Sequence, residues 1–208
     1  MKKVKLITPD LYLSESLAIV GSSGSLKDKK YGEKIDCYKH VVRFNRAPTD
    51  GFEDIVGAKR SLTVANMHVF ANVQLKKKSG WKQDDVEFIR NLRNTRVLMF
   101  APENKNWKNK DKNIHKTVKG HIVEYKKMQD ILVEMGFVSK KQPTAGFGFI
   151  MLCVYSGLVP HLFGFDTEPR QRDHYWEKRD NNTSYHNITE EMRILKKMHK
   201  SGKILLHK

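Results

Sequence analysis

Short apolar runs alternate with segments of helical periodicity along this chain. The first run, 17–20, leads into a glycine-rich sequence and is typical of a buried strand. Apolar residues then recur at helical spacing through 86–92 and 128–135, and Gly136 is suited to end the second helix. The other strands that the pattern predicts are 41–44, 62–65, 97–100, 161–165 and 203–206.

This alternation predicts a three-layer α/β/α fold with a mostly parallel central sheet. The length of 208 residues fits one domain, which we place at 1–208, and no internal repeat is present. Ligands of such sheets bind beyond the carboxyl ends of the strands. The segments that follow Val20, Phe44 and Phe165 are therefore expected to lie near one another.

One long stretch without charged residues, 142–165, raises the question of a membrane span. It contains two prolines and four glycines, which a single spanning helix would accommodate poorly. We interpret it as a buried helix, a turn at 157–160 and a buried strand.

Lys and Arg outnumber Asp and Glu by 39 to 23, which gives a net charge of +16. Such a charge concentrates anions of any kind, including nucleic acid, anionic lipid and sugar nucleotides. The lysine runs 76–78, 105–112 and 196–203 lack a pattern of interleaved aromatic residues, which is typical of a solvated surface. Peripheral contact with an anionic membrane is the alternative, and specific nucleic-acid binding is not expected.

Polar residues follow the predicted strands. The glycine turn 21–25 has backbone N–H groups that can cradle a phosphate, although a plain turn has the same composition. Asn45 offers one acceptor and two donors, as recognition of a base or a sugar requires. Thr144 opens an apolar helix whose N–H groups and dipole can hold a phosphate or a carboxylate, and an ordinary helix start is the alternative.

His174 and His186 lie in a polar region, although nine histidines in the chain make chance a serious rival. Asn187 and Glu190 form a capping-box pattern for a helix that runs through Lys200, so His186 precedes a helix N-terminus. The dipole there favours the neutral imidazole that a general base needs, whereas the glutamates of the first turn oppose this effect. Metal binding by the two histidines lacks a third ligand at a recognisable spacing.

Four of these segments together resemble the motifs of the eukaryotic-type sialyltransferases, glycosyltransferase family 29. VGSSGSL, RFNRAPT and GFEDIVG within 17–60 resemble the large sialylmotif (VVGNSGNL, RMN.APT, GFE.DVG), and PTAGFGFIMLCVYSGLVPHLFGFD within 143–166 resembles the small one. HYWE at 174–177 is similar to the third motif, and His186 with Glu191 is similar to the H-x4-E motif. The motifs occur in order and span 17–191.

The resemblance implies a modified GT-A/Rossmann-like nucleotide-binding fold. It implies inverting transfer of sialic acid, or a related 2-keto-3-deoxy sugar, from a cytidine monophosphate (CMP) donor to a hydroxyl of a glycan or glycolipid. No metal or other cofactor is needed in the family. His186 is then the catalytic base, and His174 supports the leaving phosphate. The implied donor-binding residues are Gly21, Ser22, Ser23, Gly24, Ser25, Asn45, Thr144, Ala145, Gly146, Gly164 and Phe165, and the supporting residues are Tyr175, Trp176 and Glu191.

This chain departs from the family pattern at several positions. Ser22 and Ser25 replace two asparagines, so the nucleotide contacts or the donor itself are expected to differ. The paired cysteines of Golgi members are replaced by Leu17 and Gly157, and no secretory signal is recognisable at the start. We therefore expect a cytoplasmic enzyme. A catalytically silent nucleotide- or carbohydrate-binding protein and a basic nucleic-acid-binding protein are the competing hypotheses.

Overall fold

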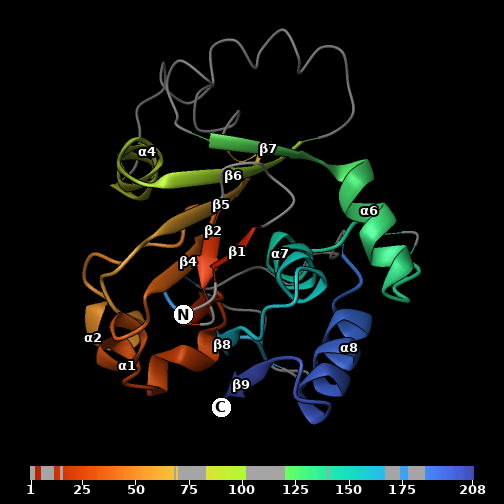
Figure 1. Cartoon of the computed structure of the whole chain (residues 1–208). Coiled ribbons are helices and arrows are strands. Elements are labelled where there is room, and N and C mark those ends of the chain that lie inside the picture. Colours follow the sequence, from red (N-terminus) through yellow and green to blue (C-terminus); the bar gives the residue numbers. More distant parts are fainter. Residues whose placement is uncertain are drawn as a thin grey trace, which may run out of the picture.

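A seven-stranded sheet forms the centre of the molecule (Figure 1), and every strand pairing within it is parallel. The computed structural model describes residues 3–5, 12–14, 16–67, 69, 83–101, 120–139, 141–166, 174–177 and 186–208. In spatial order the strands are β7 (Gly120–Glu124), β6 (Arg96–Ala101), β5 (Leu62–Asn66), β4 (His40–Phe44), β3 (Leu17–Val20), β8 (His161–Phe163) and β9 (Leu205–His207).

The strand order reverses direction between β3 and β8. From β3 the chain proceeds outward through β4, β5, β6 and β7, then returns to β8 on the other side of β3 and continues to β9. A reversal of this kind leaves a crevice beyond the carboxyl ends of the two central strands, and doubly wound sheets bind their ligands there. Because β3 and β8 are neighbouring parallel strands, the segments after Val20 and Phe163 lie side by side.

Helices cover both faces of the sheet (Figure 1). One face carries α1 (Gly32–Asp36), α2 (Glu53–Val56) and α4 (Gln83–Asn94), and the other carries α6 (Tyr125–Glu134), α7 (Ala145–Tyr155) and α8 (Ile188–Lys200). Strand β3 shows why both faces must be covered. Leu17 and Ile19 belong to the core shared with α7, whereas Ala18 and Val20 pack toward α1 and the 3-10 helix η1 (Gly24–Asp28). All four side chains are buried, as strands of parallel sheets require.

The predicted three-layer parallel fold is confirmed, and most predicted strands lie within two residues of their observed positions. Strand β8 ends at Phe163 because Gly164 adopts a positive φ of 69° and turns the chain. The last strand is 205–207 rather than 203–206, because Gly202 turns the chain at a positive φ and the N–H of Lys203 still donates to the Met198 carbonyl of α8 at 2.9 Å. Strand β7 and the separate antiparallel hairpin of β1 (Lys3–Lys5) and β2 (Tyr12–Ser14) were not predicted.

The uncharged stretch 142–165 has the predicted structure of a buried helix, a turn and a strand. Helix α7 buries residues on all sides, and Gly157 reverses the chain at a φ of 82°. Among the helices in the described part of the chain, none is both long and apolar enough to cross a membrane. Cys153 on this helix is buried and Cys37 is exposed, and both thiols are free.

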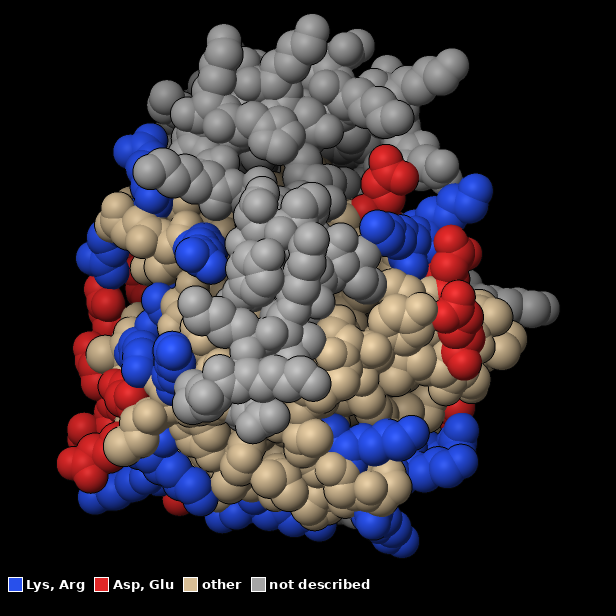
Figure 2. Space-filling view, in the orientation of Figure 1, with Lys and Arg blue, Asp and Glu red and all other residues tan. Residues whose placement is uncertain are grey.

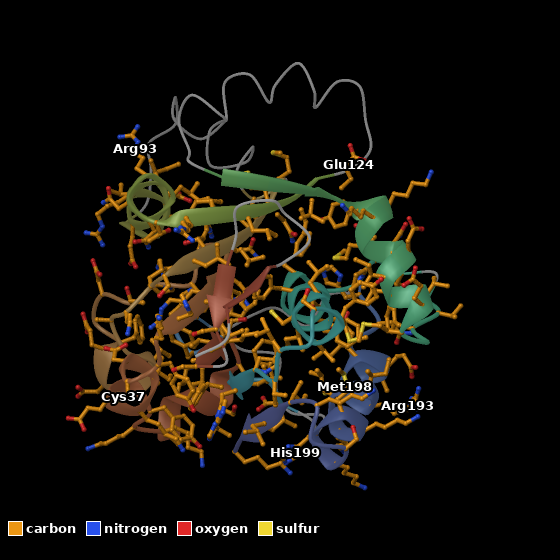
Figure 3. The ribbon with its side chains drawn as sticks, in the orientation of Figure 1. Cys37, Arg93, Glu124, Arg193, Met198 and His199 are labelled. Carbon is orange, nitrogen blue, oxygen red and sulfur yellow. The ribbon has the colours of Figure 1, made fainter. Side chains whose placement is uncertain are left out.

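Helix α8 begins where the sequence indicates but is capped differently. Asn187 is the N-cap residue, yet its side chain caps no N–H group, so the predicted capping box is wrong. Glu190 instead accepts hydrogen bonds of 2.7 and 2.6 Å from Arg193, its partner one turn along the helix. Figure 3 shows the two faces of this helix, with Arg193 pointing away from the protein and Met198 on the side toward α7.

Candidate active site

The glycine turn after β3 lies directly against the end of β8. The N–H of Gly21 donates to the carbonyl of Phe163 at 2.7 Å, and the N–H of Ser23 donates to that of Gly164 at 3.4 Å. A Cβ on Gly21 would lie 2.4 Å from the Gly164 carbonyl oxygen, so only glycine permits this approach. Gly164 is constrained by its backbone, because side chains rarely adopt its φ of 69°, and a Cβ there would also lie 2.5 Å from Leu26 Cδ1.

Most N–H groups of this turn donate within the protein. Besides those of Gly21 and Ser23, the N–H of Ser25 donates to Ser23 Oγ at 3.1 Å, and that of Leu26 to the Ser23 carbonyl at 3.2 Å. Most of the backbone N–H groups that the sequence predicted as a phosphate cradle therefore already donate to acceptors within the protein.

A carboxylate that sequence reasoning missed lies at the same turn. Asp166 accepts a hydrogen bond from the Ser25 hydroxyl at 2.6 Å through Oδ1 and a second from the Ser23 hydroxyl through Oδ2. Its place directly after Phe165 at the end of a strand is the signal that could have drawn attention to it.

The segment 174–177 is bonded to the glycine turn 21–25 through the backbone. His174 forms an isolated antiparallel bridge with Ser23, and the N–H of Tyr175 donates to the Ser22 carbonyl at 3.1 Å. The His174 ring stacks on Trp176 with a centroid distance of 4.2 Å, and its Nδ1 lies 2.9 Å from the carboxylate of Glu177. Glu177, which was not among the predicted site residues, thus orients this ring.

Tyr175 anchors the segment rather than exposing a reactive group. Its ring is 2% exposed and meets Phe52 edge-on at 5.3 Å, and its hydroxyl donates to the Pro48 carbonyl. Burial raises the pKa of this phenol well above its ordinary value. Tyr175 therefore anchors the segment that carries His174 and Trp176.

Phe165 joins the glycine turn to the start of α7. A Cβ on Gly21 or on Gly146 would lie 3.0 Å from its ring, and the ring meets Phe44 edge-on at a centroid distance of 6.2 Å. Phe44 is the last residue of β4 and precedes Asn45. The three predicted donor-binding segments thus converge on one aromatic side chain.

Asn45 adopts a left-handed backbone conformation with φ of 46°, which asparagine tolerates better than most residues. Its Oδ1 accepts from the N–H of Asn66 at 2.9 Å, and Asn66 Oδ1 in turn accepts from the Tyr125 hydroxyl at 3.0 Å. The acceptor that the sequence suggested for ligand recognition is therefore already used inside the protein. The two N–H donors of the amide are the part of Asn45 suited to a ligand.

Thr144 caps α7 and binds Glu191 of α8. Its hydroxyl accepts from the N–H of Phe147 at 3.1 Å and donates to Glu191 Oε2 at 2.7 Å, while its own N–H donates to Glu191 Oε1 at 2.8 Å. Glu191 is 5% exposed. Burial raises the pKa of its carboxyl, whereas the bonds from Thr144 and the nearby His186 act in the opposite direction. Ala145, the next residue of α7, is buried.

His186 is fixed to the same helix start. Its Nδ1 lies 2.8 Å from the carbonyl oxygen of Gln142, which can only accept, so Nδ1 carries a proton. The neutral ring is then the tautomer with its lone pair on Nε2. Gln142 contributes only a backbone carbonyl, which no side-chain pattern in the sequence could have indicated.

The described residues contain no group of three or more His, Cys, Asp or Glu side chains placed to hold a metal ion. The expected metal independence stays a prediction.

A parallel α/β/α sheet with these polar segments at its switch point has the GT-A-like fold of known glycosyltransferases. The fold matches the crystal structure of a mammalian sialyltransferase in complex with Gal-beta-1-3GalNAc-ortho-nitrophenol, with a TM-score of 0.62 and 21% identity over 92% of this chain and 68% of that one. The family model of glycosyltransferase family 29 (sialyltransferase) matches residues 14–203. The chain belongs to this family.

Curated relatives are similar over shorter stretches. One is the CMP-N-acetylneuraminate-beta-galactosamide-alpha-2,3-sialyltransferase 1 of Sus scrofa, 55% identical over 42 residues, or 20% of this chain. Another is the beta-galactoside alpha-2,6-sialyltransferase 2 of Takifugu rubripes, 39% identical over 64 residues, or 31% of this chain. Each alignment spans 12% of the relative's length.

Proposed function

We propose that this protein transfers sialic acid, or a related 2-keto-3-deoxy sugar, from a CMP donor to a hydroxyl of a glycan or glycolipid. The observation that carries the proposal is the pair of hydrogen bonds from Thr144 to Glu191. They join the H-x4-E motif to the small sialylmotif, while the bridge from His174 to Ser23 joins the third motif to the large one. The two motifs of each pair are distant in the sequence. The ring of Phe165 connects the two pairs, because it packs against both Gly21 of the large motif and Gly146 of the small one.

His186 is the proposed general base. An acceptor hydroxyl is a weak nucleophile, and attack on an anomeric carbon with oxocarbenium character leaves a proton to be removed. Gln142 holds Nδ1 of the ring, so the lone pair on Nε2 is the one that takes this proton. Glu191, in the first turn of α8 and five residues after His186, fixes the start of this helix and with it the position of the base.

His174 is the proposed partner of the leaving phosphate. Glu177 and the stacked Trp176 fix its ring beside the glycine turn. In the doubly protonated form the ring donates through Nε2, and a charged donor stabilises the negative charge that grows on the phosphate as the glycosidic bond breaks. The leaving group is a monophosphate and offers no diphosphate for a cation to bridge, which supports a metal-independent reaction.

Mass spectrometry of a panel of CMP sugars incubated with a panel of glycan acceptors tests the proposed activity. Transfer adds the mass of one sugar to one acceptor and releases CMP. Samples without acceptor measure donor hydrolysis, which separates an active enzyme with an unidentified acceptor from a silent binding protein. A protein that binds CMP but consumes no CMP sugar under any condition would be the catalytically silent alternative.

Thermal unfolding tests the choice of nucleotide. A ligand that binds only the native state raises the melting temperature by mass action, so CMP should raise it more than uridine or adenosine monophosphate. Asn45→Asp is the informative variant, because it keeps the acceptor for Asn66 and removes the two amide donors. Most of the CMP effect should be lost in this variant. Equal shifts from all three nucleotides would refute the cytidine assignment.

A further inference from the structure

Asp166 and two serines form a compact polar cluster at the switch point of the sheet. Asp166 comes three residues after β8, and Ser23 and Ser25 belong to the turn after β3, the neighbouring parallel strand. Each carboxylate oxygen of Asp166 accepts a hydrogen bond from one of these hydroxyls, and the bond between Ser25 Oγ and Oδ1 is 2.6 Å long. All three residues are partly exposed. The carboxylate is therefore fixed in position and accessible.

The cluster presents acceptors to a ligand. A serine hydroxyl has one proton, and both serines donate theirs to Asp166. Ser23 Oγ additionally accepts from the N–H of Ser25. A carboxylate has about four acceptor sites, and the serines occupy two of them. The sites that are left on Asp166 select a ligand group that donates hydrogen bonds, and its negative charge disfavours an anion.

We propose that Asp166 is a specificity-determining residue that accepts hydrogen bonds from the ribose hydroxyls of the donor nucleotide. The inference rests on the proposed function, since it presupposes a CMP sugar. The phosphate and the sugar carboxylate of such a donor are anions, whereas the ribose carries two neighbouring neutral hydroxyls, which match the two oxygens of one carboxylate. In dinucleotide-binding folds an acidic side chain about 20 residues after the glycine-rich turn binds a ribose hydroxyl, so a carboxylate at this edge of a parallel sheet is suited to that contact.

The proposal also explains one departure from the family pattern. Ser25 replaces an asparagine of the large sialylmotif, and its hydroxyl holds Asp166 Oδ1. Serine at position 25 and aspartate at position 166 therefore act as a pair, in which the short hydroxyl positions the group that contacts the ligand. Nothing in the structure explains the serine at position 22.

Calorimetric titration with CMP and with 2′,3′-dideoxycytidine monophosphate tests this role. The wild-type protein should bind CMP about ten- to a hundred-fold more tightly, as expected for hydrogen bonds to a charged group. Asp166→Asn should reduce this ratio to near one while binding of the dideoxy nucleotide stays close to wild type, which also shows that the variant is folded. Asp28→Asn is the matched control, because it removes the same charge from an exposed residue of η1 and should keep the wild-type ratio. Ser25→Ala should give an intermediate ratio.

The outcomes separate this inference from the proposed function. Wild-type protein that binds both nucleotides equally, or Asp166→Asn protein that loses affinity for both to the same extent, would overturn the ribose contact and leave the cytidine donor in place. Wild-type protein that binds neither nucleotide would refute the cytidine donor, and the ribose contact with it.

Discussion

Glu191 accepts two hydrogen bonds from Thr144, at 2.8 Å from its N–H group and at 2.7 Å from its hydroxyl. The bond between His186 Nδ1 and the Gln142 carbonyl lies beside them, so the segments 142–144 and 186–191 are joined at two points. A buried carboxylate of α8 thereby determines where the proposed base is held relative to α7, the helix within the small sialylmotif.

Glu191→Ala should lower both stability and activity. Removal of the carboxylate leaves the Thr144 N–H without its acceptor in a partly buried position, which costs about 1–3 kcal/mol. Urea unfolding measures this loss. Glu191→Gln should lose less, because its carbonyl oxygen still accepts one of the bonds. Glu190→Ala is the control on the same turn, since Glu190 bonds the exposed Arg193 and no other side chain of the described residues, and it should change stability much less. Equal losses in the Glu190 and Glu191 variants would contradict this role.

Stability should fall as the pH drops from about 6.5 toward 4, partly because of His207. Burial and nearby Lys34, His161 and His199 lower the pKa of its imidazole to about 4, from 6.5 when unperturbed. The unfolded chain therefore binds a proton in this range that the folded chain does not, so stability rises with pH across it. His207→Phe keeps an aromatic ring to stack on Phe163 and should flatten this slope in unfolding experiments at a series of pH values. A slope identical to wild type would show that His207 does not contribute.

Transfer should continue in the presence of a strong chelator. The proposed reaction meets the charge of the leaving monophosphate with His174 and nearby donors rather than with a cation. Initial rates with and without EDTA test this directly. Activity that EDTA abolishes and Mn²⁺ restores would establish a metal requirement.

The protein should bind anionic vesicles in a salt-dependent manner. Figure 2 shows Lys and Arg gathered along the lower edge of the molecule, over α1, β9 and α8. The exposed lysines of these elements and their flanks include Lys34, Lys197, Lys200, Lys203 and Lys208. Each basic residue near such a surface contributes about 1 kcal/mol, which salt screens. Co-sedimentation that does not decrease with added salt would contradict an electrostatic attachment. The cytoplasmic location itself stays a prediction.

Periodicity predicted the parallel sheet because its strands are buried on both faces and so appear as apolar runs, as in 17–20. The hydrogen-bond partners of individual side chains were harder to predict from the sequence. The Asn187 capping box is absent because Glu190 pairs with Arg193 instead. The bond between Ser25 and Asp166 joins residues 141 positions apart, and only the strand order brings them together. The single-residue roles at the site depend on such long-range contacts.

Comparison of nucleotide binding with sugar transfer in His186→Ala is the most direct test of the proposed chemistry. Titration with CMP should give an affinity close to wild type, whereas transfer to a verified acceptor should fall about 10²- to 10⁴-fold, the usual contribution of a general base. His174→Ala should instead weaken both CMP binding and transfer, because that ring is assigned to the phosphate. Wild-type turnover by His186→Ala at neutral pH would contradict the assignment of His186 as the base.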